Sequence, residues 1–254
     1  MPPWVREQHT KDIRMQLTGP AIDYLRKPHF LRKLFKLPPL IVIEPFDINC
    51  LGSNSYDLHL DNKLRVYTHT LPKGMKPAIP YDKEKYESGG YSMRDWFDDP
   101  WLYEDYCLRP EKYDFRNPKF LLNPCDDKTH ETIDITIPET GLILSPNVGY
   151  LGSTLEYTET RLLFPYIDGK SSLGRNFILN HHTAGRGDDG FCGQWTLEIK
   201  TLYPTVVFPN MRIGQIYYEM FIGKRKPYNK NKASHYNNQI GPTAAAPIGI
   251  EKCR

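Results

Sequence analysis

The sequence lacks several features that would indicate a secreted, metal-stabilised or membrane-spanning protein. Its 254 residues include 5 cysteines, widely spaced and without a C-x-x-C pair, so neither a disulfide framework nor a structural zinc site is expected. No apolar run approaches the roughly 20 residues that a transmembrane helix needs. The amino-terminal residues show no apolar segment followed by a small-residue cleavage site, which argues against a signal peptide and favours a cytoplasmic protein.

The net charge is also small. The 33 Lys and Arg against 30 Asp and Glu leave +3, too little to indicate a nucleic-acid-binding protein by itself. The charge is uneven, because residues 82–105 contain eight acids and three bases, a local net of −5 that leaves +8 for the remainder. No Gly/Ser linker or internal repeat divides the chain, so we expect one domain over residues 1–254.

Short runs rich in Val, Ile, Leu, Tyr, Phe and Thr lie between the prolines and glycines, a pattern that favours a mainly β fold. The best helical stretch is residues 21–35, where Pro28 must end or kink any helix. The predicted strands are residues 40–43, 56–60, 142–144, 150–157, 196–201, 205–208 and 213–220.

Residues 71–128 differ in character from the rest. They are acidic, rich in Tyr, Trp, Asp and Pro, and lack sustained alternation, so we interpret them as an insertion within the β scaffold. Two interpretations stay open: a surface excursion packed down by its own aromatic side chains, or a partner-binding surface or lid.

Residues 168–175, Asp-Gly-Lys-Ser-Ser-Leu-Gly-Arg, place two hydroxyls and two cations in a turn bracketed by glycines. Backbone amides, hydroxyls and an arginine fork are the donors that phosphate oxygens need, so the turn is a candidate anion cradle. An exposed polar loop is the alternative, and the order of residues is not that of a P-loop.

Glu198 stands between two apolar residues in a run whose alternation places Thr196, Glu198 and Lys200 on one face. This face is either solvated or holds a half-buried carboxylate. In the second case, desolvation would raise the pKa of the carboxylate into the range useful for acid and base catalysis. The neighbouring His181 and His182 would point to opposite faces of a strand, so a metal pair is not expected there.

The stretch 223–239 contains five Lys or Arg and one His but no acid, with interleaved tyrosines and amides. It suits a flexible basic tail, residues 223–254, that closes over a polyphosphate. An RNA-binding tail and a solvated, disordered tail are the alternatives.

Several blocks of sequence together resemble the dCTP deaminase family, relatives of the trimeric dUTPases, over most of the chain outside the insertion. They follow one another in family order. The blocks are residues 43–47, 52–58, 151–157, 169–175, 181–184, 190–198, 211–215 and 228–239.

The resemblance implies a distorted jelly-roll, or β-clip, dUTPase-like subunit that forms a homotrimer with active sites between subunits. The implied reaction is hydrolytic deamination of dCTP to dUTP and ammonia, with Mg²⁺ accompanying the triphosphate. No catalytic zinc is expected, because Pro124-Cys125 lacks the second cysteine of the zinc deaminase pattern. The resemblance also makes dTTP a candidate inhibitor. Membranes and nucleic acid are not expected partners.

The resemblance also implies roles for individual residues. Glu198 would act as general base and acid, with Ser171 and the carbonyl of Ala184 around the attacking water and Arg175 nearby. Asp188 would hold the sugar 3′-hydroxyl, and backbone groups near Thr196 and Leu197 would recognise the cytosine. The implied phosphate-binding residues are Lys170, Ser171, Ser172 and Arg175, and the residues that close over the phosphates are Tyr228, His235 and Gln239. Further implied substrate-binding residues are Leu173, Gly174 and Gln215.

The sequence departs from the family pattern at three positions. Gly187 and Asp189 replace the apolar residue and the proline that usually flank the sugar-binding aspartate, which predicts a looser loop or one with an extra charge. His235 stands where a lysine is usual, which leaves open whether triphosphate is preferred over monophosphate.

Ala184-Gly185 and Gln215 resemble the bifunctional members, which continue to dUMP and pyrophosphate. The alternatives are a dUTP pyrophosphatase without deamination and a non-catalytic nucleotide-sensing relative.

Overall fold

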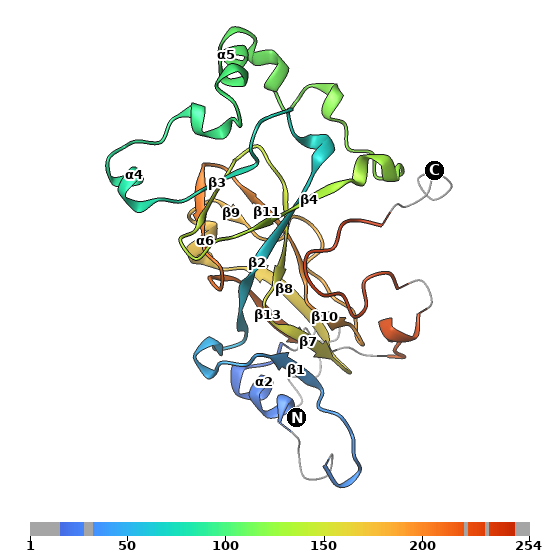
Figure 1. Ribbon diagram of the computed structural model, residues 1–254. Coiled ribbons are helices and arrows are strands. Elements are labelled where there is room, and N and C mark those ends of the chain that lie inside the picture. The colour runs from blue at the N-terminus through green and yellow to red at the C-terminus, as the bar shows by residue number, and fades with distance from the viewer. Residues whose placement is uncertain (1–15, 28–32, 221–222, 232–233, 247–254) are drawn as a thin grey trace, which may run out of the picture.

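The computed structural model describes residues 16–27, 33–220, 223–231 and 234–246. The chain is mainly β with short helices, as predicted (Figure 1). The α-helices in the described part are α2 (Gly19–Arg26), α4 (Lys83–Glu87), α5 (Pro100–Leu108) and α6 (Ser171–Gly174). The 3-10 helices there are η1 (Ile48–Cys50), η2 (Thr68–Thr70), η3 (Met93–Trp96), η4 (Pro110–Tyr113), η5 (Pro118–Phe120), η6 (Asp127–His130) and η7 (Tyr228–Lys230).

The largest sheet is seven-stranded and curves until it nearly closes on itself. Its strand order is β8-β13-β2-β6-β11-β9, with β4 also paired to β2, and the pairs are antiparallel. Its strands are β2 (Tyr56–Tyr67), β4 (Thr132–Thr136), β6 (Tyr150–Thr154), β8 (Phe164–Gly169), β9 (Ile178–Leu179), β11 (Thr196–Thr201) and β13 (Arg212–Glu219).

Two three-stranded antiparallel sheets complete the scaffold, with orders β1-β7-β10 and β12-β5-β3. The strands of the first are β1 (Ile41–Glu44), β7 (Tyr157–Thr160) and β10 (Cys192–Gly193). Those of the second are β3 (Ala78–Pro80), β5 (Leu142–Leu144) and β12 (Thr205–Val207).

Alternation of buried and exposed side chains explains how these strands form one core. In β11, Leu197 and Ile199 are fully buried, whereas Lys200 is exposed, so every second residue faces the interior. The same period in β2 buries Leu58 and Leu60 within the main core. One face of β11 is therefore fixed by packing, which leaves the face of Glu198 available for a site.

Several sequence predictions of strands are confirmed, with adjusted ends. Residues 142–144 form β5 and 196–201 form β11 as predicted, whereas the run 56–60 continues to Tyr67. The run 150–157 divides into β6 and the start of β7. The helix predicted over 21–35 is realised as α2, which ends at Arg26, because a residue before Pro28 is disfavoured in helical conformation; residues 28–32 lie outside the described residues.

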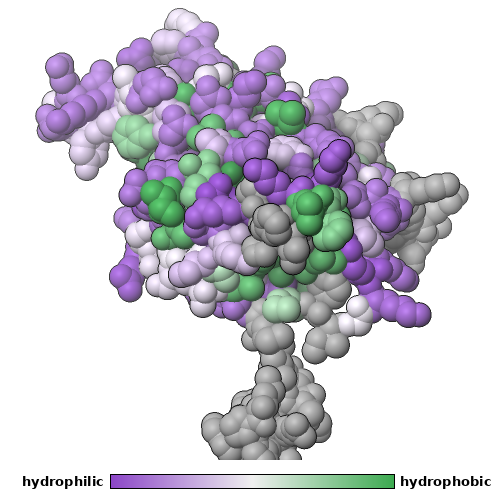
Figure 2. Space-filling view, turned by 90° about the horizontal axis from the view of Figure 1, so that it is seen from below, coloured by the Kyte–Doolittle hydropathy of each residue, from purple (hydrophilic) through white to green (hydrophobic). Residues whose placement is uncertain are grey.

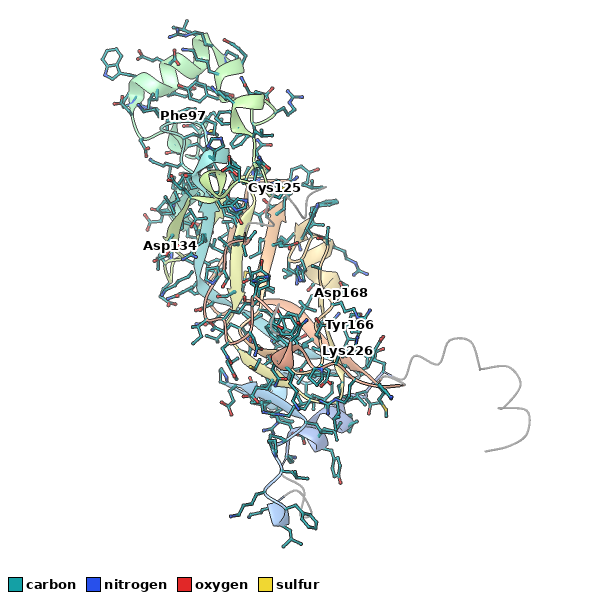
Figure 3. All side chains as sticks on the ribbon, turned by 90° about the vertical axis from the view of Figure 1, so that its right-hand side faces the viewer. Phe97, Cys125, Asp134, Tyr166, Asp168 and Lys226 are labelled. Atoms are coloured by element: carbon teal, nitrogen blue, oxygen red, sulfur yellow. The ribbon has the colours of Figure 1, made fainter. Side chains whose placement is uncertain are left out.

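The predicted insertion, residues 71–128, is divided between the scaffold and a separate lobe. Ala78–Pro80 pairs with β5 as strand β3, so this part belongs to a sheet. The lobe with α4 and α5 extends away from the sheets at the top of Figure 1. Met75, Phe97 and Tyr113 form a small core of their own there, and Figure 3 shows Phe97 in this lobe. The lobe is therefore packed by its own aromatic side chains.

Seen from below, hydrophilic side chains cover most of the visible face, with smaller hydrophobic patches between them (Figure 2). Among the described residues, no helix has the length and hydrophobicity to cross a membrane. Cys50, Cys107 and Cys192 are free thiols, whereas Cys125 is disulfide-bonded, a bond that the cysteine spacing did not predict.

Candidate functional site

A cavity of about 490 Å³ lies beside β11, and we call it the first cavity. Its walls come from the end of β2, from β6 and β11, from the loop 180–191 and from the carboxyl-terminal segment 227–245. The size and the mixture of aromatic walls with a few polar groups are typical of a small-molecule site. It is lined by Tyr67, Leu151, His181, Ala184, Arg186, Gly187, Asp188, Phe191, Trp195, Thr196, Glu198, Tyr228, Tyr236, Gln239, Thr243 and Ala245.

Glu198 is the carboxylate that β11 presents to this cavity, and its side chain is 37% exposed. Its Oε2 accepts backbone hydrogen bonds from His182 at 3.1 Å and Thr183 at 3.3 Å. His181 Nδ1 lies 3.6 Å from the same oxygen. These contacts fix the carboxylate, and Oε1 has no hydrogen-bond partner among the described residues. Of the two interpretations of this face, the half-buried carboxylate is the one observed.

Aromatic side chains that the sequence analysis treated as ordinary apolar residues form much of the cavity wall. Trp195 donates from Nε1 to Thr158 Oγ1 at 2.9 Å, which fixes its indole ring. Phe191 packs against it with ring centroids 4.6 Å apart, and Tyr228 lies 6.2 Å from Phe191. This wall can bind the face of a flat heterocyclic ring.

The loop that carries Asp188 explains two of the departures from the family pattern. A Cβ at Gly187 would lie 2.2 Å from Trp195 Cη2, so the indole occupies the space of a larger residue here. Asp189 is buried and pairs with Arg225, whose Nε lies 2.8 Å from Oδ2. It also accepts a 2.7 Å bond from the Leu162 N–H. The extra charge is therefore neutralised by the carboxyl-terminal segment.

The carboxyl-terminal segment continues along the rim of the cavity. The Tyr228 N–H donates to the Asp189 carbonyl at 2.7 Å, and Gln239 forms a parallel bridge with Gly193. Farther on, the Thr243 N–H donates to Thr196 Oγ1 at 3.1 Å. Tyr228 and Gln239, both predicted site residues, thus line the cavity. His235 is exposed and does not line it, whereas its neighbour Tyr236 does.

The predicted anion cradle lies on a different part of the surface. Lys170 precedes α6 and pairs with Asp57, which also receives Arg212 at 3.3 Å. Ser171 and Arg175 are exposed, and none of residues 170–175 lines the first cavity. Since Lys170 is already paired, Arg175 is the cation of this turn without a carboxylate partner among the described residues.

Gln215 belongs with the cradle rather than with the first cavity. Its Nε2 donates to the Gly169 carbonyl at 3.0 Å, and its Oε1 accepts from Ser55 at 2.8 Å. Asp168 of the adjacent β8, labelled in Figure 3, lies opposite Gln215 in the sheet. The predicted residues therefore fall into two groups. The first cavity contains Ala184, Asp188, Thr196, Glu198, Tyr228 and Gln239; the cradle surface contains Lys170, Ser171, Ser172, Leu173, Gly174, Arg175 and Gln215.

Two of the predicted residues need separate mention. Leu197 faces the core, so only its backbone can contribute to the site. His181 and His182 lie in a loop. The assumption that they lie on a strand, from which opposite orientations of their side chains were expected, is therefore wrong. Within the described part of the chain, no group of three His, Cys, Asp or Glu side chains is arranged to hold a metal ion.

Known proteins resemble this chain over much of its length. A family model described as dCTP deaminase-like matches residues 108–221. A protein named "dCTP deaminase, dUMP-forming" from Hathewaya histolytica is 42% identical over 201 residues, which cover 79% of this chain and 85% of that protein. The chain belongs to the dCTP deaminase family.

Two further known proteins match this chain. A protein with the same name from Clostridium botulinum (strain Eklund 17B / Type B) is 34% identical over 203 residues, 80% of this chain and 87% of that protein. A crystal structure of 2′-deoxycytidine 5′-triphosphate deaminase from Agrobacterium tumefaciens is 18% identical with a TM-score of 0.46. That match covers 83% of this chain and 49% of the other, so the chain spans about half the length of that protein.

Proposed function

We propose that this protein deaminates dCTP and continues to dUMP and pyrophosphate. The observation that supports this most is the carboxylate of Glu198, held by two backbone N–H groups in the wall of a cavity that also contains Asp188. The dUMP-forming names of relatives at 42% and 34% identity support the bifunctional form.

In this proposal Glu198 transfers protons during attack of water on C4 of the cytosine. Oε1 accepts a proton as the water oxygen bonds to C4, and the same carboxyl group then protonates N3. Glu198 next takes the proton of the new C4 hydroxyl and passes it to the amino group. The C4–N bond breaks, ammonia leaves, and the oxygen remains on the ring as the C4 carbonyl. Because both hydrogen bonds from the loop end on Oε2, the other oxygen is available for the water.

The remaining cavity residues have binding roles. The cytosine lies against the aromatic wall of Trp195 and near the backbone of Thr196 and Leu197, and the sugar 3′-hydroxyl bonds to Asp188. Ala184 lines the same cavity, and in this proposal its carbonyl accepts a hydrogen bond from the attacking water. Tyr228 and Gln239 cover the nucleotide from the carboxyl-terminal side.

We further propose that a homotrimer completes each site. Ser171 and Arg175 are expected beside the water and the phosphates, yet they line no part of the first cavity of their own chain. A neighbouring subunit that places its cradle surface, with Gln215, against this cavity would supply them. Mg²⁺ then travels with the triphosphate, held by phosphate oxygens and water as is usual for this ion, and dTTP would compete for the same cavity.

A time course with dCTP and Mg²⁺ tests the proposal, with dUTP, dUMP, pyrophosphate and ammonia all followed. We expect dUMP to appear in step with ammonia with little free dUTP. Glu198→Gln should stop ammonia release, while dUTP added directly is still converted to dUMP. Accumulating dUTP would indicate a simple deaminase, and conversion of dUTP with dCTP left intact would indicate the pyrophosphatase alternative.

A matched control keeps the interpretation of Glu198→Gln clear. Glu159 is another carboxylate on a strand of the same scaffold, pairs with Arg161 and does not line the first cavity. Glu159→Gln should therefore retain ammonia release. If dCTP raised the melting temperature of the wild-type protein and of both variants, and none of the three turned dCTP over, the nucleotide-sensing alternative would be supported.

A further inference from the structure

A second cavity of about 420 Å³ borders the first one at Glu198. Tyr67, Leu151 and Glu198 line both cavities, so the carboxylate stands in a shared wall. The sheet supplies Ile199 and Lys200 to the second cavity. The insertion supplies the opposite wall, made of Phe115, Phe120 and Leu122.

The wall from the insertion is anchored to the body of the protein. Phe115 packs against the main core as well as against the core of the lobe. Its ring lies 6.4 Å from that of Phe120. The insertion is thus attached beside Glu198, which gives this segment a place next to the reacting groups of the proposed function.

The lining of the second cavity is suited to passage rather than to tight binding of an ion. Most of it is aromatic or aliphatic, and Glu198 is the one carboxylate among its described lining residues. Lys200 is exposed and has no carboxylate partner in the described part of the chain. A cation such as ammonium has no second acidic group to hold it there, whereas small neutral molecules meet no charged barrier on the apolar walls.

The first cavity offers little room for such traffic once a nucleotide is bound. Tyr228, Tyr236 and Gln239 of the carboxyl-terminal segment line it, and ligand sites of this kind enclose most of the surface of their ligand. Each deamination nevertheless consumes one water and releases one ammonia at Glu198. His182, whose N–H holds Oε2, lines the second cavity, so this cavity reaches the carboxylate from another direction.

We propose that the second cavity is the passage through which water reaches Glu198 and ammonia leaves while a nucleotide fills the first cavity. This inference rests on the proposed deamination. Water enters, its oxygen bonds to C4 and its proton moves to Glu198; the C4–N bond then breaks and neutral ammonia leaves by the same route. The insertion, through Phe120 and Leu122, forms one side of this passage.

Gly149 offers a way to fill the passage without disturbing the fold. It lines the second cavity and not the first, and a Cβ built on it meets no atom within 4 Å. Gly149→Leu should lower kcat for ammonia release from dCTP by about tenfold, the effect of roughly 1.4 kcal/mol on the barrier. The affinity for dUMP, the product that is not turned over further, should stay unchanged in calorimetry, and Gly149→Ala should behave as the wild type.

Leu122 provides a second variant from the insertion side, where its side chain is 40% exposed. Leu122→Trp should reproduce the selective loss of ammonia release, and Leu122→Ala should retain it. If Gly149→Leu and Leu122→Trp both have the wild-type kcat, and the wild-type protein does release ammonia, the proposed passage is overturned and the proposed function stands. A weakened affinity for dUMP together with a lower kcat would overturn it in favour of a nucleotide-binding role. A wild-type protein that releases no ammonia would overturn the proposed function itself.

Discussion

The ion pair between Asp189 and Arg225 predicts that the carboxyl-terminal segment can be detached by a single substitution. Arg225 lies two residues before the segment that lines the first cavity and donates two hydrogen bonds to Asp189, at 2.8 and 3.2 Å. The carboxylate is 4% exposed, whereas the guanidinium is 41% exposed. Arg225→Ala leaves a buried carboxylate with the Leu162 N–H as its remaining hydrogen-bond donor among the described residues.

The free-energy cost of Arg225→Ala follows from this geometry. Removing one partner of a fully buried pair costs about 3–5 kcal/mol. Arg225 is partly exposed, so water replaces part of the lost bonding, and we expect about 1–2 kcal/mol, in line with one or two partly hydrated charged hydrogen bonds. Since 1.4 kcal/mol is a factor of ten, the ratio of docked to undocked segment falls by about 5- to 30-fold.

Two assays measure this change. KM for dCTP should rise by up to this factor, and limited proteolysis should cleave the segment after residue 225 faster than in the wild type. Arg225→Lys should lose less, and Arg225→Ala should add little to Asp189→Asn because the two residues form one unit. Lys226→Ala is the matched control. If Arg225→Ala shows the wild-type KM and proteolysis rate, the pair does not hold the segment and the reasoning is refuted.

Two further predictions concern stability. Gly187→Val should lower the free energy of unfolding in urea by about 1–3 kcal/mol, because its Cβ would overlap the Trp195 ring; a variant as stable as Gly174→Ala, where a Cβ meets nothing, would contradict this. The hydrogen bond from Lys85 holds the pKa of Asp95 below its usual range, helped by the Ser92 N–H. A carboxyl group whose pKa is lowered on folding stabilises the fold at pH values above its unfolded pKa of about 4. Asp95→Asn should therefore have a lower Tm than the wild type above that pH, and the same Tm once the pH falls below the lowered pKa. A Tm difference that stays constant across pH would contradict the ion pair.

The sequence predicted those strands whose alternation is regular. The run that became β11 buries Leu197 and Ile199 on one side and presents Glu198 on the other, so both its class and its functional face could be inferred. Strands β8 and β4 were missed. Strand β8 contains Pro165 and Gly169, which favour turns in isolation, and pairing with β13 overrides that local preference.

The candidate site was predictable where a residue type is rare in its setting. Glu198 could be singled out because an acid between two apolar residues of a strand is unusual, whereas Asp188 was named only through the resemblance to the family. Trp195 and Tyr236 were missed because aromatic residues in such runs are most often core. The bond between Asp189 and Arg225 joins residues 36 positions apart, a contact that only the fold creates.

The base of the insertion has a consequence for engineering the protein. Tyr67, the last residue of β2, is paired with Thr132, the first of β4, and the Thr68 N–H donates to the Glu131 carbonyl at 2.9 Å. The whole stretch between them is thus topologically a hairpin loop whose two ends are already held side by side. Closing such a loop costs entropy that grows only slowly with its length. This hairpin is therefore a natural splice point. An exchange of the whole stretch would leave the curved sheet in register but would remove strand β3 from the β12-β5-β3 sheet, so the inserted segment would have to supply a replacement strand.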